Sequence, residues 1–434
     1  MHAQFARVRT RLRGTRDAFA LALLGLAVGG CAGLVGIAFR GTIELWQFVL
    51  IPSGGFSAVE RSMRFALPVT GVVLTIAVLY LIARGPVPTG VVHVLDSLAH
   101  AKGRLSLKSA IVQFIAGSLL LVFGMSMGRE GPAIHLGAAS GSLIAQRLRM
   151  PESALRTLVG CGVAAAIGAA FNTPLAGVIL AIEVVLIEYS VGGFTPILLS
   201  AVTGATLGRL VYGDAPAFFV PDVVFGTLWE LPWIAAMGLA IGAYAAAFAS
   251  IAETIMRGMR RMPWWSAILA AGVLVGAFGA FVPQVLGIGY DVIELTLRGQ
   301  YAFGTLALIA AAKLVATAVG VGARVPAGLI GPILVMGAAF GGAFGVVGTG
   351  LIPQGTSNVA LYAMLGMAAM MGATLQAPLS ALIAVLELTG NPHVILPGIL
   401  AIVTASLATK HLFQCDSVFA VQMREMGSTA AREH

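Results

Sequence analysis

The chain has 434 residues, of which 58% are hydrophobic and only 10% are charged, and its mean hydropathy is +0.95. This composition excludes an ordinary soluble globule and indicates a polytopic membrane protein. The net charge of +8 is concentrated ahead of the first apolar run, at Arg7, Arg9, Arg11, Arg13 and Arg16. The positive-inside rule therefore predicts a multi-pass protein of the cell (inner) membrane with cytoplasmic N- and C-termini, rather than a nucleic-acid-binding protein.

Apolar stretches predict helices along the whole chain. The first, residues 18–50, continues well past Cys31 and predicts a retained long helix rather than a cleaved signal. Several later stretches are shorter than the roughly 20 residues that span a bilayer, and many contain Gly or Pro. Short, interrupted helices are typical of transporters, whose broken helix ends face a substrate near the midplane. The later stretches are 66–83, 109–127, 131–146, 157–171, 174–189, 194–212, 231–256, 264–282, 303–321, 329–347, 358–372, 378–389 and 394–409.

The segment Gly128-Arg129-Glu130-Gly131-Pro132 is the first candidate site. It places two charged side chains directly before an apolar run, where an ionisable group is costly and indicates function. Glycine allows a backbone to approach a ligand closely, and proline favours the first turn of a helix. Since the N-terminus of a helix attracts anions, Glu130 is predicted to compete with a bound anion for this position.

An internal repeat extends this interpretation. Residues 131–141 align with 331–341 at an offset of 200, and six of the eleven positions are identical. A second pair follows, in which Thr173-Pro174-Leu175 leads to Glu183 and Ala377-Pro378-Leu379 leads to Glu387. The sequence therefore predicts one transmembrane domain (1–434) with two repeated halves, 16–212 and 228–412, and a short C-terminal helix and tail, 413–434. Helix starts from both halves would converge on one site and replace the water around an anion.

Three segments resemble the CLC chloride channel and proton/chloride antiporter family: residues 128–132, 328–332 and 171–177. The resemblance implies an all-α membrane protein of two inverted helical repeats with broken, tilted helices. It further implies a homodimer whose subunits are in contact through residues 174–210 and 378–410. It also implies transport of small anions, with possible coupling to protons. It implies no enzyme activity, no cofactor and no metal.

The resemblance assigns Glu130 as the gate and, with Glu188 as a second candidate, as part of a proton pathway. It implies that backbone amides around Arg129 and of Leu329 and Ile330 line the anion sites. The full set of implied anion-binding residues is Gly85, Pro86, Gly128, Arg129, Gly131, Leu329, Ile330 and Cys415.

Four positions depart from the family pattern. Pro86 stands where a serine hydroxyl is usual, which leaves chloride or nitrate as the preferred anion, with Thr89 as a substitute hydroxyl. Ile330 replaces a phenylalanine, and Cys415 replaces the tyrosine of the inner gate, whose phenol a thiol replaces poorly. Val184 stands where exchangers carry an inner glutamate. A channel and a proton-coupled antiporter therefore both remain open.

Other residues have competing interpretations. Gly124-Met125-Ser126-Met127-Gly128 fits the nucleophile pattern of serine hydrolases, so an intramembrane hydrolase using Ser126 is the alternative function. Glu183 and Glu387 are expected to bond to nearby backbone, and His135 to be a packing residue rather than a proton relay. Arg129 is either an ion-pair or membrane-edge residue or part of the anion entrance. Lys313 either raises the positive potential of the pathway or extends to an interface.

Overall fold

The computed structural model describes residues 2–187, 191–220, 225–351 and 357–427. Within these ranges the chain is helical, and the β pairing is one isolated antiparallel bridge, between Gly128 and Gly328. Nine helices of the described part are long and apolar enough to cross a membrane, and shorter apolar helices lie between them. This confirms the prediction of an all-α, multi-pass membrane protein.

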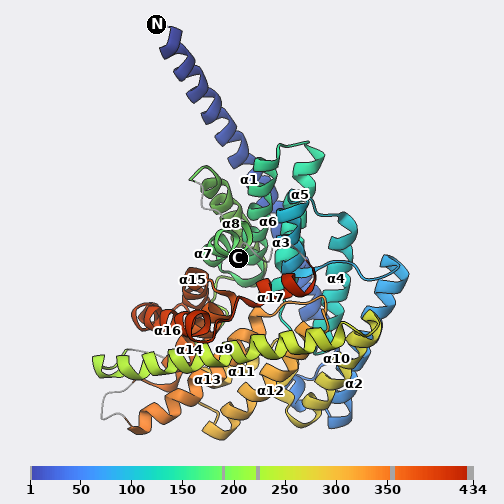
Figure 1. Cartoon of the computed structure of the whole chain (residues 1–434), viewed down its shortest axis with the longest axis vertical. Helices are drawn as coiled ribbons and strands as arrows, with labels where there is room; N and C mark the ends of the chain where they lie inside the picture. Colours follow the sequence, from blue (N-terminus) through green and yellow to red (C-terminus); the bar gives the residue numbers. More distant parts are fainter. Residues whose placement is uncertain (1, 188–190, 221–224, 352–356, 428–434) are drawn as a thin grey trace.

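Helices α1 to α8 form the first half of the chain, and helices α9 to α16, followed by α17, form the second (Figure 1). The first eight are α1 (His2–Leu50), α2 (Arg61–Val78), α3 (Gly90–His100), α4 (Leu107–Val122), α5 (Glu130–Arg147), α6 (Glu152–Phe171), α7 (Pro174–Leu180) and α8 (Val191–Tyr212). The others are α9 (Leu231–Met259), α10 (Trp264–Phe281), α11 (Tyr290–Leu297), α12 (Phe303–Gly322), α13 (Ile330–Leu351), α14 (Val359–Leu375), α15 (Pro378–Thr389), α16 (Ile395–Leu407) and α17 (Val418–Glu425). Short π-helical segments extend α2, α7 and α16.

Equivalent breaks occur in the two halves. Helix α6 ends at Asn172 with φ 57°, and α14 ends at Gln376 with φ 55°, both in the left-handed conformation that commonly closes a helix. Two residues later Pro174 and Pro378 begin α7 and α15, because proline suits a first helical turn. The repeated sequence therefore produces repeated local structure.

Each half contains a helix pair packed through glycine. A Cβ at Gly137 of α5 would lie 2.2 Å from the carbonyl oxygen of Gly162 in α6. In the second half, a Cβ at Gly337 of α13 would lie 2.3 Å from the carbonyl oxygen of Gly366 in α14. Small residues let membrane helices approach closely, and here they hold α5 and α13 firmly within the core.

Reciprocal contacts relate the halves. The Gly128 amide donates to the Gly328 carbonyl at 2.6 Å, and the Gly328 amide donates to the Gly128 carbonyl at 2.7 Å. Glu183 accepts hydrogen bonds from backbone amides at the start of α15, while Glu387 accepts them at the start of α7. Such exchanged contacts are those of a local two-fold relation, as the predicted pair of inverted repeats requires. Figure 1 shows α7, α8, α15 and α16 together on one side of the molecule.

Candidate anion pathway

The starts of α5 and α13 meet at the centre of the candidate site. The bridge between Gly128 and Gly328 joins the two segments directly before these helices. Glycine is needed for this approach, since a Cβ at Gly131 would lie 2.6 Å from the Cα of Gly328. The first amides of a helix have no acceptor within their own helix, and the helix dipole makes this end positive. Two such ends side by side form a site suited to an anion.

The carboxylate of Glu130 already lies at this site. Glu130 is only 4% exposed, and its Oε2 accepts a hydrogen bond from the backbone amide of Gly331 at 3.0 Å. Its Oε1 accepts a second from the hydroxyl of Tyr290 at 3.0 Å. A Cβ at residue 331 would lie 3.2 Å from Oε1, so glycine leaves the room that the carboxylate uses. A first-half side chain therefore occupies the helix start of the second half.

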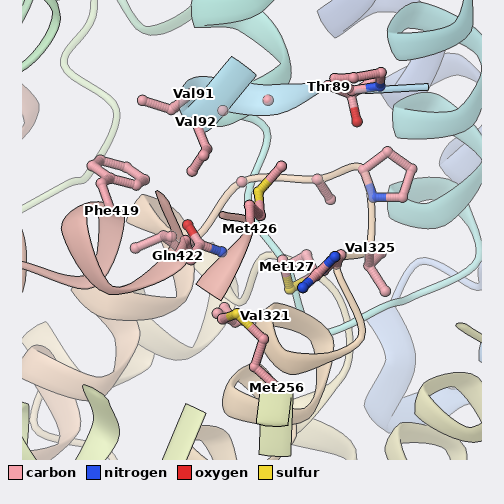
Figure 2. A pocket seen from close by; sticks show the side chains of 18 of the residues that line it. Thr89, Val91, Val92, Met127, Met256, Val321, Val325, Phe419, Gln422 and Met426 are labelled. Atoms are coloured by element: carbon pink, nitrogen blue, oxygen red, sulfur yellow. The ribbon is translucent and has the colours of Figure 1, made fainter. Parts of the chain in front are cut away.

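A cavity of about 300 Å³ reaches the helix starts from one side. We call it the α17 cavity, because Phe419, Gln422 and Met426 from and just after α17 line it. It also contacts the predicted anion-binding residues Gly131, Leu329 and Ile330. Figure 2 shows the carboxamide of Gln422 pointing into this cavity, whose other labelled walls are largely apolar.

A second cavity of about 840 Å³, the α11 cavity, contacts Arg129, Phe171 and Tyr290. Gly131 lines the first cavity and Arg129 lines the second, so the two cavities approach Glu130 from either side along the chain. The α11 cavity also carries charge of both signs, at Arg40, Glu44, Asp291, Glu294 and Arg298. Glu130 therefore lies between a residue that lines one cavity and a residue that lines the other.

Arg129 is held by contacts on the α11 side. Its Nη1 lies 3.3 Å from Oε1 of Glu44, and its guanidinium carbon lies 4.8 Å from the ring centre of Phe171 and 5.1 Å from that of Tyr290. The residue is 7% exposed, and its Nε has no hydrogen-bond partner within the described residues. The interpretation of Arg129 as an ion-pair residue is thus confirmed. Its Nε–H, unpaired among the described residues, belongs to a guanidinium that lines the α11 cavity.

Some of the remaining predicted anion-binding residues line the α17 cavity, and others do not. Gly85 has φ 141°, which glycine tolerates, and this turn places Pro86 and Thr89 in the lining of the α17 cavity. Cys415 is not among the residues that line this cavity; its carbonyl accepts a hydrogen bond from Nε2 of Gln376 at 2.8 Å, and burial raises the pKa of its thiol. Glu188, the second proton-pathway candidate, lies outside the described residues.

Sequence reasoning missed two groups of residues. Phe419, Gln422 and Met426 recur at helical spacing, which places them on one face of the last helix but does not reveal what that face contacts. Tyr290 had no motif signal at all. Its contact with Glu130 joins residues 160 positions apart, and only the folded chain brings them together.

The competing interpretations are now separated. Glu183 and Glu387 both bond to backbone amides, as predicted. His135 is fully buried and accepts a hydrogen bond from the Gly90 amide at Nδ1, in keeping with a packing role. Lys313 is 0% exposed, and its Nζ donates to the carbonyls of Val285 and Gly287 at 2.8 and 2.7 Å. The expectation that it extends to an interface is therefore wrong.

The hydrolase alternative receives no support from the structure. Ser126 is fully buried, and its Oγ lies 3.4 Å from the hydroxyl of Thr317. His135, the nearest candidate base in sequence, contacts Gly90, Gln113 and Ser109 instead. A nucleophilic serine needs a base within hydrogen-bond reach and access to substrate. The contacts of Ser126 are those of a packing residue.

The fold and the paired helix starts define a multi-pass membrane protein of the broken-helix transporter class. Residues 70–410 match the family described as voltage gated chloride channel. A protein from Ralstonia nicotianae, whose name describes it as a ClcB-like chloride channel protein, is 32% identical to this chain. The match covers 92% of this chain and 95% of the relative's own length. The chain therefore belongs to the voltage gated chloride channel family.

Other relatives agree with this assignment. A protein named H(+)/Cl(-) exchange transporter ClcA from Salmonella paratyphi B is 28% identical, over 93% of this chain and 88% of its own length. The crystal structure of a slow cyanobacterial Cl-/H+ antiporter matches with a TM-score of 0.80 at 22% identity, covering 94% of this chain and 98% of that one. A CLC-type fluoride/proton antiporter matches with a TM-score of 0.73 at 22% identity, covering 93% and 98%. The solved structures show that this chain shares their fold.

Proposed function

We propose that this protein transports small monovalent anions across a membrane and that Glu130 is the gate. The path runs from the α17 cavity, past the starts of α5 and α13, to the α11 cavity. The observation that carries this proposal is the hydrogen bond between the Gly331 amide and Oε2 of Glu130. The amide at a helix start is the donor that a dehydrated anion needs, and here a tethered carboxylate occupies it.

The gate works by competition. While Glu130 is ionised and bonded to Gly331, its carboxylate blocks the helix start of α13. An arriving anion displaces the carboxylate, or protonation removes its charge and weakens its hold on the positive helix end. Because burying a bare anion without donors costs tens of kcal/mol by Born solvation, the anion crosses only where these amides replace its water. The mechanism uses backbone and side-chain groups and requires no cofactor.

Chloride or nitrate is the proposed substrate. Chloride is supported by the names of the relatives, which include a chloride channel protein and an H(+)/Cl(-) exchange transporter. Nitrate is supported by Pro86, which lines the α17 cavity but offers neither a hydroxyl nor an N–H. Thr89, Arg324 and Gln422 are side chains of this cavity that can donate to either anion.

The proposed assembly is a homodimer in a cell membrane, with both termini in the cytoplasm. The arginine cluster before the first apolar run supports this orientation, which places the α17 cavity on the cytoplasmic side. The grouped helices α7, α8, α15 and α16 expose large apolar side chains, among them Leu175 (50%), Leu379 (60%) and Leu396 (63%). A partner copy would cover this face, and the molecular mass of the purified protein in detergent tests it.

Reconstituted liposomes test transport and coupling together. Under an imposed chloride gradient, anion efflux and external pH are recorded for the wild type and for Glu130→Ala. We expect anion flux in both proteins and a flux that ignores pH in the variant, because the competing carboxylate is gone. Uphill proton movement in the wild type that Glu130→Ala abolishes assigns an antiporter, and anion flux without proton movement assigns a channel. No anion flux in either protein would overturn the proposed function.

A further inference from the structure

The hydroxyl of Tyr290 is the second hydrogen-bond donor to the Glu130 carboxylate. The Gly331 amide holds Oε2 at 3.0 Å, and Tyr290 holds Oε1 at 3.0 Å. The two donors differ in kind. The amide belongs to the helix start that binds the anion, whereas the phenol comes from α11 and reaches the carboxylate from the α11 cavity that it lines. Hydrogen bonds to an ionised carboxylate are shorter and stronger than neutral ones.

Tyr290 is fixed in place from several directions. Gly289, with φ 88°, precedes it as the N-cap of α11, and the loop before Gly289 is anchored by Nζ of Lys313 through the carbonyls of Val285 and Gly287. The Gly287 amide in turn donates to the Gly124 carbonyl at 2.9 Å. This network attaches the start of α11 to α12 and to the segment before α5.

The ring of Tyr290 is clamped as well. Phe218 packs edge-on against it at 5.0 Å between ring centres, and the guanidinium carbon of Arg129 lies 5.1 Å from the ring centre. A phenol held by a packed ring on an anchored loop does not follow a moving carboxylate. When Glu130 leaves the helix start, it therefore has to break this hydrogen bond.

We propose that Tyr290 is a positioning residue that holds Glu130 across the pathway and sets how strongly the carboxylate competes with the anion. This inference rests on the proposed function and deepens it. The anion takes the place of the carboxylate at the Gly331 amide, so any contact that favours the carboxylate raises the anion concentration needed to displace it. Tyr290 favours the carboxylate without itself occupying that amide.

The test is a double-variant cycle on liposome anion flux. Tyr290→Phe removes the hydroxyl and keeps the ring, and it is measured in the wild type and in Glu130→Ala. In the wild type we expect the half-saturating anion concentration to fall about tenfold, the factor that one hydrogen bond to a charged group supports. In Glu130→Ala we expect the same substitution to change this concentration less than about twofold, because its partner is already gone.

A matched control is Tyr244→Phe. The hydroxyl of Tyr244 donates a hydrogen bond to the carbonyl of Ala310 at 2.7 Å and lines neither cavity. The control substitution therefore also removes a tyrosine hydroxyl, but one that does not contact Glu130. We expect this control to have the same half-saturating anion concentration as the wild type. The inference is overturned if Tyr290→Phe has the same half-saturating anion concentration as the wild type. It is also overturned if this concentration rises both in the wild type and in Glu130→Ala, as expected for an anion ligand or a purely structural residue. Glu130→Ala behaving as the wild type overturns the gate itself, which keeps the two failures separate.

Discussion

Two buried glutamates in this chain each accept a hydrogen bond from a tyrosine, yet their surroundings differ sharply. Glu230 is fully buried and accepts from the Thr227 amide, from the amide and hydroxyl of Ser357, and from the hydroxyl of Tyr362 at 2.7 Å. Glu130 accepts two hydrogen bonds, from Gly331 and Tyr290. Burial alone therefore does not identify a gate.

The number of donors and the adjacent space separate the two sites. Glu230 completes a capping box before α9 and connects this segment to the start of α14. It lines neither of the two pathway cavities. Residues on both sides of Glu130 line cavities, and one of its donors is a helix-start amide that an anion can take over. A fully bonded carboxylate is a structural lock, whereas a partly bonded one beside water can move.

The largest predicted effect tests this contrast through stability. Glu230→Ala leaves up to four buried donors without an acceptor, each costing roughly 1–3 kcal/mol, so we expect the free energy of unfolding to fall by about 3 kcal/mol or more. Glu130→Ala is expected to lower it by under about 1 kcal/mol, because water or an anion can replace the carboxylate. Unfolding of both variants in detergent, followed by intrinsic fluorescence, measures the difference. Equal losses for the two variants would remove the distinction between lock and gate.

A smaller effect is expected at the glutamates exchanged between the halves. Glu183 accepts from the amides of Leu379 and Ser380 and from the Ser380 hydroxyl, and Glu387 accepts from the amides of Leu175 and Ala176. Each acts as a negatively charged cap on a helix of the other half, a contact worth about 1 kcal/mol. Glu183→Gln and Glu387→Gln should each lower stability by about that amount.

Transport separates these caps from the gate. Both cap variants should keep the wild-type response of anion flux to external pH, since their carboxylates lock helices and do not contact the pathway cavities. The Glu130→Ala variant, assayed in parallel, supplies the positive reference. Loss of proton movement in Glu183→Gln would contradict the structural role and place this residue in a proton route.

Sequence reasoning was most reliable where a local pattern is repeated. The two Gly-Pro segments predicted the starts of α5 and α13, and the two following prolines predicted α7 and α15, because glycine and proline act within a single turn. The backbone bonds of Glu183 and Glu387 were also predicted. The helix starts depend on residues close in sequence, whereas the partners of Glu183 and Glu387, which lie in the opposite half, were not predicted.

Contacts between distant segments were not predictable in the same way. Lys313 was expected either to raise the positive potential of the pathway or to extend to an interface. It does not extend to an interface but anchors a loop through two carbonyls, and such contacts have no sequence signature. Tyr290 gave no signal because its partner lies on another helix. For Glu230, the spacing from Thr227 fits a local capping box, but it does not reveal the contact with Tyr362 of α14. The lining of the α17 cavity by Gln422, and not by Cys415, depends on how α17 packs against α3, α9 and α14. Such details follow from packing rather than from pattern.

The smallest predicted effect concerns the charge beside the gate. Arg129 lines the α11 cavity and is 7% exposed, with one guanidinium nitrogen 3.3 Å from Glu44. Arg129→Gln should raise the half-saturating anion concentration about threefold, as a loss of about 0.6 kcal/mol of electrostatic attraction implies. Because charges that are largely buried are screened little by salt, the change should persist at high ionic strength.

Arg298 gives the matched control for this last comparison. It lines the same cavity, but its side chain is 44% exposed and pairs with Glu294 one turn earlier on α11. Arg298→Gln should produce a smaller change that disappears in high salt, where exposed charges more than a Debye length from the anion are screened. Anion flux measured at low and high ionic strength, with an impermeant salt to set the strength, separates the two arginines. If both effects vanish together, Arg129 acts only through the general potential of the cavity; if the Arg129 effect alone persists, its charge acts locally at the helix starts beside Glu130.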